Sequence, residues 1–259
     1  MIDTHVYLSR WPFRRLPGDE TLALVARLRE NGVVQAWMGS FEALLHRDVT
    51  GVNARLTADC RDHGDDLLIP FGTINPTLPG WQDDLKRCVA EHDMPGIRLH
   101  PNYHGYHLDE AVFAEFLDRA GESRLIVQLV VRMEDDRTQH PFVRVPATDL
   151  APLAELLATR PELRVVLSSA LRSPSDATLA KLTKSQAYFD IATLEGISAL
   201  QRLLKIMPHE RLLLGSMFPL FYLESAVLKL RESEIGHAAE EAITRGNAAR
   251  LLHSRSPAS

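Results

Sequence analysis

Short apolar runs alternate with longer amphipathic segments from one end of the chain to the other. Eight of the runs have the length of a β-strand and are rich in Val, Ile, Leu and aromatic residues. They cover residues 2–7, 33–39, 67–74, 96–100, 125–131, 164–169, 187–192 and 211–216. Between them, apolar residues recur with the period of an α-helix, which predicts that strands and helices alternate along the chain.

The amphipathic segments include residues 19–32, 81–93, 108–121, 149–161 and 175–185. In the first of these, Asp19 stands at an N-cap position and Gly32 at the expected helix end. Eight strands, each followed by a helix, predict an α/β protein: a single (β/α)8 TIM barrel domain over residues 1–259. An open doubly wound sheet is the alternative. The number of strands disfavours it, and no Gly-rich phosphate loop follows the first strand.

Composition and charge narrow the classes of function. The formal net charge is −5, and the chain has no basic run, so we expect no nucleic-acid partner. No apolar stretch approaches the roughly 20 residues that span a bilayer, so we expect no membrane partner. The first predicted strand begins at residue 2, which predicts a cytoplasmic protein without a signal peptide. Cys60 and Cys88 fall in helical patterns and are expected to be buried free thiols rather than a disulfide.

Two predicted loops are longer than a minimal turn. Residues 11–19 follow the first predicted strand, and residues 132–149 follow the fifth. Both leave the C-terminal end of a strand, the face at which barrel enzymes build their active sites. Loops of this length in a compact domain are usually functional. A surface lid or a contact in a homo-oligomer is the alternative.

Five short motifs occur in a fixed order at barrel spacing. They are "DTH" at residues 3–5, "GIRLHP" at 96–101, "RVVLSSALRS" at 164–173, "LLLGSMFP" at 212–219 and "RGNAARLL" at 245–252. With these motifs the chain resembles the amidohydrolase superfamily, in particular its amidohydrolase-related branch of small hydrolases and decarboxylases. The resemblance covers nearly the whole chain. It implies the barrel fold and a site at the C-terminal mouth, and it leaves the activity open.

The resemblance also implies a metal site, and this sequence replaces most of its ligands. Members with a metal have His-x-His on strand 1, a His at the ends of strands 5 and 6, and an Asp on strand 8. His5 keeps the first position, and the other four positions fall on Tyr7, Gln128, Ser169 and Met217. These four side chains are poor Zn²⁺ ligands at neutral pH. We therefore expect no metal and no other cofactor.

Residues 100–109 offer a different set of ligands. Four side chains of this segment could hold a metal together with His5: His100, His104, His107 and Asp109. Their spacing suits ligands on a helix, but Pro101 and Gly105 predict that no helix forms here. A metal-dependent hydrolase with such a rearranged site is one alternative.

Strand alternation places donors and cations at the predicted mouth. The candidate substrate-binding residues are Tyr7, Arg98, His104, Gln128, Arg132, Arg137 and Ser169. Because arginine holds carboxylates and phosphates through paired hydrogen bonds, we expect a small anionic molecule between Arg98 and Arg132. Pairing of these two arginines with carboxylates of residues 134–136 is the alternative.

Acid–base chemistry remains available without a metal. Histidine transfers protons near neutral pH, and a carboxylate on the long loop could orient a water. The candidate catalytic residues are His5, His100, Asp135 and His140. The sequence thus predicts a metal-independent hydrolase or decarboxylase of a small carboxylated substrate. A non-catalytic barrel that binds a small anion or a protein partner is the alternative.

Overall fold

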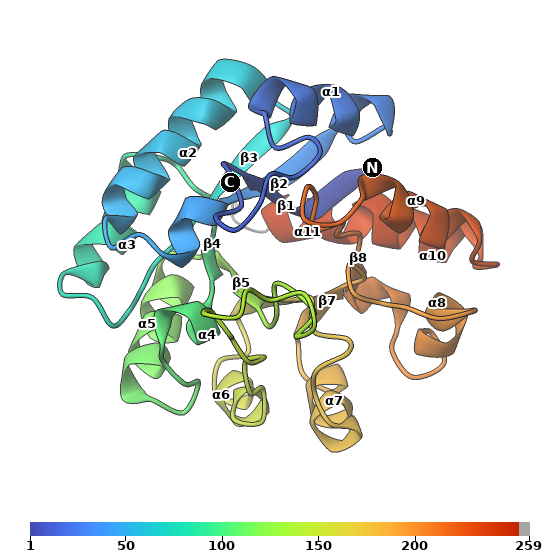
Figure 1. Cartoon of the computed structure of the whole chain (residues 1–259). Coiled ribbons are helices and arrows are strands. Elements are labelled where there is room, and N and C mark those ends of the chain that lie inside the picture. Colours follow the sequence, from blue (N-terminus) through green and yellow to red (C-terminus); the bar gives the residue numbers. More distant parts are fainter. Residues whose placement is uncertain (254–259) are drawn as a thin grey trace.

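Eight parallel strands form a barrel that helices surround (Figure 1). The computed structural model describes residues 1–253. Each strand pairs with the next one in sequence: β1 (Ile2–Leu8), β2 (Gln35–Ser40), β3 (Leu68–Gly72), β4 (Gly96–Leu99), β5 (Ile126–Val130), β6 (Arg164–Ser168), β7 (Tyr188–Asp190) and β8 (Leu212–Leu213). The predicted (β/α)8 fold and all eight predicted strands are confirmed, with strand ends shifted by a few residues.

Backbone hydrogen bonds between β1 and the segment that follows β8 close the barrel. They run from Thr4 N to Leu214 O (2.9 Å), from Met217 N to His5 O (2.7 Å) and from Tyr7 N to Phe218 O (2.9 Å). Because of these bonds, residues 214–218 lie beside the first strand. Side chains from the two ends of the chain therefore meet at the mouth of the barrel.

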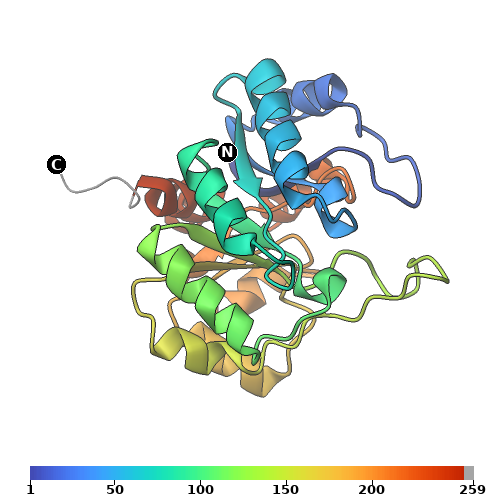
Figure 2. The ribbon, with the colours of Figure 1, turned by 90° about the vertical axis from the view of Figure 1, so that its left-hand side faces the viewer.

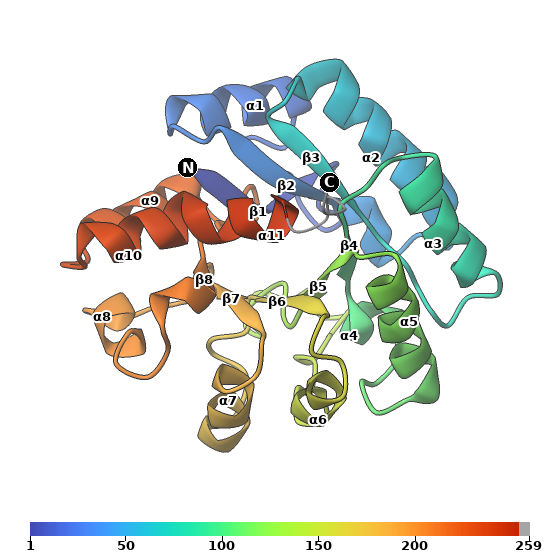
Figure 3. The ribbon, with the colours of Figure 1, turned by 180° about the vertical axis from the view of Figure 1, so that it is seen from behind.

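Helices cover the outside of the sheet, where their apolar faces pack on outward-facing strand residues such as Ile97 and Leu99. The longer helices are α1 (Thr21–Glu30), α2 (Val49–Gly64), α3 (Trp81–Ala90), α5 (Ala111–Glu122), α7 (Asp176–Thr183) and α9 (Leu223–Arg231). The shorter ones are η1 (Phe41–Leu44), α4 (Pro101–His104), α6 (Leu153–Ala158), α8 (Ala199–Leu203), η2 (His209–Arg211), α10 (His237–Glu241), η3 (Ala242–Gly246) and α11 (Asn247–His253). Figure 3 shows the barrel from the N-terminal ends of its strands, where α11 packs against β1 and β8.

The predicted cap of the first helix is wrong. Helix α1 begins after Glu20, and Asp19 gives it no cap. The Asp19 carboxylate instead accepts two hydrogen bonds from Arg15, at 2.8 and 2.7 Å, and one from the amide of Leu16. These hydrogen bonds lie within the first long loop. Because they occupy the Asp19 carboxylate, it does not cap the N-terminus of α1.

The prediction that residues 100–109 contain no helix is also wrong, because residues 101–104 form α4. Proline is favoured at the first helical position, where its missing N–H costs nothing. Gly105 ends the helix in the left-handed region, with φ +72°, which glycine adopts without strain. Pro101 and Gly105 are therefore the start and end of this short helix.

The two long loops project from the same end of the barrel (Figure 2), and their side chains contact each other. Arg14 of the first loop lies 2.6 Å from the buried carboxylate of Glu134 in the second. The rings of Phe13 and His140 stack with their centroids 5.5 Å apart. The loops thus form a joint cover beside the mouth.

Two further predictions concern thiols and membranes. Cys60 and Cys88 are buried free thiols, as predicted. None of the helices formed by residues 1–253 has both the length and the apolar character that crossing a membrane requires.

Candidate functional site

A cluster of buried polar side chains lies at the C-terminal ends of the strands. Its members are each at most 1% exposed: His5 and Tyr7 from β1, Arg98 and His100 from β4 and its end, Gln128 from β5, Ser169 after β6, and Asp190 from β7. The two-residue alternation of a strand turns these side chains into the barrel, while their neighbours face the helices. We call this set the central cluster.

His5 and Asp190 form the closest charged contact of the central cluster. The distance from His5 Nδ1 to Asp190 Oδ2 is 2.8 Å. Burial alone would raise the pKa of Asp190, but His5 and the amides of Ser169 and Ala192 outweigh it and lower that pKa. Burial lowers the pKa of His5. The pair is therefore a carboxylate beside a neutral imidazole, with the proton on Nδ1 facing the carboxylate.

The hydroxyl of Tyr7 lies between two imidazoles. It is 3.3 Å from Nε2 of His5 and 3.0 Å from Nε2 of His100. Burial raises the pKa of the Tyr7 phenol and holds the pKa of His100 well below its ordinary value. With the proton of His5 on Nδ1, the phenol donates to His5 Nε2 and accepts from His100 Nε2. A chain of neutral hydrogen-bonding groups thus runs from His5 through Tyr7 to His100, and the Asp190 carboxylate contacts it at the His5 end.

Arg98 is bonded entirely to the protein. Its guanidinium donates to Gln128 Oε1 (2.9 Å) and to the backbone oxygens of Val6 (2.7 Å), Thr4 (3.1 Å) and Trp37 (2.8 Å). Gly39 leaves the room for it, because a Cβ there would lie 2.6 Å from Arg98 Nη1. Arg98 therefore ties β1, β2 and β5 together, and its predicted role in holding an anion does not fit these contacts.

Arg132 has a different environment. It lines a cavity of about 90 Å³ together with Met133, Ser169, Thr193 and other residues at the ends of β5 to β8. Its nearest carboxylate oxygen, on Asp136, is 3.9 Å away. The buried atoms Arg132 Nε and Thr193 Oγ1 have no hydrogen-bond partner among residues 1–253. The carboxylates of Glu134, Asp135 and Glu195 and the guanidinium of Arg172 also line this cavity. It thus offers a ligand the Arg132 cation and unused polar atoms beside these charged groups, without Arg98.

The other candidates on the long loop lie apart from the central cluster. Asp135 pairs with Arg137 at 2.9 Å, and this contact holds the pKa of Asp135 well below its ordinary value. His140 is exposed and stacks on Phe13. The expected arrangement, in which Asp135 and His140 orient a water at the mouth, is therefore not formed in this structure.

The histidines of the α4 segment do not form the rearranged metal site. Nε2 of His104 lies 2.9 Å from the backbone oxygen of Ala43, and its ring centroid is 6.1 Å from that of His100. His107 is exposed. In the part of the chain that the structure describes, no three His, Cys, Asp or Glu side chains lie close enough together to hold a metal ion.

Two features of the site were missed by sequence reasoning. Asp190 was not singled out, although a carboxylate at the end of an apolar strand was a usable signal. The second feature is an apolar cover over the central cluster, in which Phe41 stacks on Tyr7 with centroids 4.6 Å apart. Trp11, Leu44, Met133 and Leu220 belong to the same apolar cluster. Nothing in their spacing indicates that the chain would fold them over the mouth.

Comparisons with solved structures find the same fold over nearly whole chains. The 2,6-dihydroxybenzoate decarboxylase from Rhizobium has 14% identity and a TM-score of 0.73, with 98% of this chain and 99% of that chain covered. A dihydroxybenzoic acid decarboxylase from Polaromonas sp. JS666, with bound manganese and the inhibitor 2-nitroresorcinol, has 14% identity and a TM-score of 0.74, with 99% and 97% covered. A 5-carboxyvanillate decarboxylase from Novosphingobium aromaticivorans, also with bound manganese, has 14% identity and a TM-score of 0.74, with 97% and 96% covered.

At this identity, these structures establish the fold and not the activity. A comparison with curated proteins finds no significant match. The sequence profile of the amidohydrolase family matches residues 2–253, almost the whole chain. The order of motifs, the barrel and this match agree, and the chain therefore belongs to the amidohydrolase family.

Proposed function

We propose that this chain is an amidohydrolase-type enzyme, a decarboxylase or hydrolase that acts on a small carboxylated substrate at the C-terminal mouth of the barrel. The observation that carries the proposal is a buried series of contacts: Asp190 lies 2.8 Å from His5 Nδ1, and hydrogen bonds of the Tyr7 hydroxyl connect His5 to His100. The decarboxylases of aromatic acids among the solved neighbours support a carboxylated aromatic substrate.

Both reactions need a group that moves a proton. In a decarboxylation, a proton replaces the carboxylate on carbon and CO₂ leaves; in a hydrolysis, a base takes a proton from water. In this proposal His5 is that group. Asp190 holds its Nδ1 proton, which leaves Nε2 free to exchange a proton with the Tyr7 hydroxyl. His100, on the other side of the phenol, can replace the proton that Tyr7 gives.

The carboxylate of the substrate would bind at Arg132. Its Nε is buried without a partner among residues 1–253, and the cavity that it lines also contains Thr193 and Ser169. Met133 connects this cavity to the central cluster, because its sulfur lies 3.4 Å from the Tyr7 hydroxyl. A substrate larger than the cavity has to displace Met133 and the loops above it, and only then reaches Tyr7.

The manganese of the solved neighbours raises the question of whether this cluster fits a metal. It does not. The hydroxyl of Tyr7 lies between Nε2 of His5 and Nε2 of His100. Because the pKa of this phenol is raised, it stays neutral and separates the two nitrogens. The positions of the remaining family ligands hold Gln128, Ser169 and Met217, so no carboxylate or imidazole stands at any of them, and the Gln128 oxygen already accepts a hydrogen bond from Arg98. We therefore propose a reaction that proceeds without the family metal.

A second candidate function has one observation in its favour. Every residue of the central cluster is at most 1% exposed, under a cover of aromatic and aliphatic side chains. A barrel that binds a small anion at Arg132 without turning it over would need no more access than the cavity provides. The experiment below separates this binding function from catalysis.

The test is a turnover screen over hydroxylated benzoates and lactones with three preparations of the protein. One is as purified, one is treated with a chelator, and one is supplemented with Mn²⁺. Each is assayed by CO₂ release or by loss of substrate absorbance, and each is repeated with the His5→Gln variant. Arg61→Gln is the matched control, because this arginine is exposed on α2 and, among residues 1–253, pairs only with Asp62.

We expect turnover that survives the chelator, that His5→Gln abolishes and that Arg61→Gln leaves unchanged. Activity that appears only with Mn²⁺, or about one equivalent of tightly bound metal by elemental analysis, would show that the metal-free proposal is wrong. Saturable binding of an aromatic carboxylate without turnover would favour the non-catalytic alternative.

A further inference from the structure

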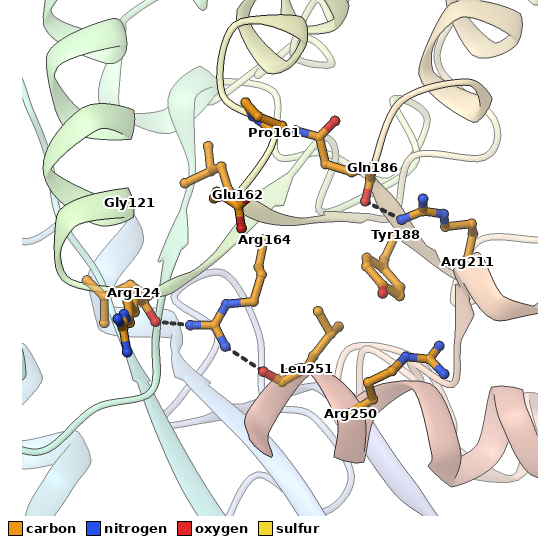
Figure 4. A pocket seen from close by; sticks show the side chains of 12 residues that line it. Gly121, Arg124, Pro161, Glu162, Arg164, Gln186, Tyr188, Arg211, Arg250 and Leu251 are labelled. Carbon is orange, nitrogen blue, oxygen red and sulfur yellow. Dashed lines mark hydrogen bonds between the residues drawn. The ribbon is translucent and has the colours of Figure 1, made fainter. Parts of the chain in front are cut away.

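A large cavity lies at the end of the barrel opposite to the central cluster. Figure 4 shows the residues that line it. Its volume is about 610 Å³, and its walls come from the C-terminal ends of α5 and α11 and from the segments before β6, β7 and β8. Four of the lining residues are arginines: Arg124, Arg164, Arg211 and Arg250. Glu162 is the one acidic residue among the described residues that line it. The cavity is therefore strongly cationic in a chain whose net charge is −5.

One of the four arginines is part of the wall. Arg164 donates to the backbone oxygen of Leu251, at 2.6 Å, and to that of Arg124. These bonds join α11 to the end of α5 and fix the floor of the cavity. Arginines at helix C-termini often have only this role, because they complement the helix dipole.

The other three guanidinium groups retain unused donors. Arg211 donates one hydrogen bond, to the Gln186 backbone at 2.7 Å, and lies over the Tyr188 ring at 5.3 Å. Arg250 uses one nitrogen, Nη2, which lies 2.6 Å from Asn247 Oδ1. A guanidinium has five N–H groups, so most donors of both side chains remain available.

Arg124 differs most from a purely structural arginine. Its guanidinium makes no hydrogen bond or ion pair with any residue in the range 1–253. Its backbone has a positive φ of 52°, a conformation that side chains other than glycine and asparagine rarely adopt. Arg124 is exposed at the rim of the cavity, so the donors of its guanidinium are available to a ligand.

We propose that this cavity binds a phosphorylated small molecule. Several guanidinium groups spread around one hollow suit a ligand with several acceptor oxygens, and a phosphoryl group presents three of them with high charge. The volume lies in the range of small-molecule sites, and the Tyr188 ring supplies an apolar wall for the rest of the ligand. The catalytic face of a barrel is its other end, so this site binds its ligand without transforming it.

The test is calorimetric titration with pyrophosphate, with citrate as a carboxylate of comparable charge, both at constant ionic strength. The proteins are the wild type, Arg124→Gln, Arg211→Gln and the control Arg61→Gln. Arg124→Gln breaks no described hydrogen bond, so it should fold like the wild type, which its melting temperature checks. Binding of pyrophosphate should be saturable and about tenfold weaker in Arg124→Gln, since about one charge-assisted contact is lost.

We expect Arg211→Gln to weaken the binding of pyrophosphate as well. Arg61→Gln should leave the affinity for pyrophosphate unchanged. The absence of saturable binding to the wild type would overturn the proposal. So would equal affinities of the wild type and Arg124→Gln. Tighter binding of citrate than of pyrophosphate would overturn the assignment to phosphate.

Discussion

His5 and Asp190 lie 2.8 Å apart at the centre of the mouth, although their strands β1 and β7 are not neighbours in the sheet. The contact spans the strand between them and exists because the barrel closes. Asp190 also accepts hydrogen bonds from the amides of Ser169 and Ala192, so its carboxylate is fixed before it meets the imidazole. This arrangement determines which nitrogen of His5 holds its proton.

The first prediction concerns the variant Asp190→Asn. Its side-chain oxygen can keep the two amide contacts, so we expect the melting temperature to change by only a few degrees. The negative charge that orients His5 is lost, and we expect kcat for any substrate found in the screen to fall about 10²- to 10⁴-fold. Asp83→Asn, at an exposed pair with Lys86, is the control and should have no effect. Unchanged kcat in Asp190→Asn would argue against His5 as the proton-transfer group.

The second prediction separates the two arginines. Arg98→Met leaves three backbone oxygens and Gln128 without their donor in the interior, and we expect a loss of about 3–5 kcal/mol in the free energy of unfolding. Arg132→Met should cost less than about 1 kcal/mol, because the side chain is partly exposed and weakly paired. Urea denaturation measures both. Equal losses for the two variants would contradict the role assigned to Arg98.

The third prediction concerns Gly39. A methyl group there would lie 2.6 Å from Arg98 Nη1 and 3.1 Å from the Tyr7 ring, and neither side chain has room to move. We expect Gly39→Ala to cost about 1–3 kcal/mol of unfolding free energy, as overpacking does. Gly236→Ala is the matched control, since a Cβ there meets nothing within 4 Å. Similar denaturation midpoints for Gly39→Ala and wild type would show that the cluster tolerates a shift of Arg98.

The fourth prediction is a pH dependence. Burial raises the pKa of Asp3 from its ordinary value of 3.8 to about 6, although amides of His5 and Ser216 donate to it. Between these values the folded protein binds more protons than the unfolded chain, so stability falls as the pH rises and levels off above about pH 6. The penalty at neutral pH is about 3 kcal/mol.

Asp3→Asn removes this titration. Relative to the variant, the unfolding free energy of the wild type should therefore decrease by about 2 kcal/mol between about pH 4 and pH 7. Chemical denaturation of both proteins across this range measures it. A constant difference between the two would mean that Asp3 titrates near its ordinary value.

Much of the fold followed from the sequence because it depends on local periodicity. Alternation within a strand also predicted correctly that His5, Tyr7, His100 and Gln128 face the interior, since successive side chains must point to opposite faces. The prediction that residues 100–109 contain no helix was wrong for the same local reason. Proline and glycine were taken as signals against a helix, when at its two ends they favour one.

The tertiary structure decided the partner of each polar side chain. Arg98 had the position expected of an anion-binding residue, but barrel closure brings backbone oxygens of β1 and β2 within its reach. Asp190 meets His5 across an intervening strand, and the loops at residues 11–19 and 132–149 fold toward each other. A sequence pattern determines the face on which a side chain lies. Which groups then meet depends on closure and on loop paths, and both are set by contacts between residues far apart in the chain.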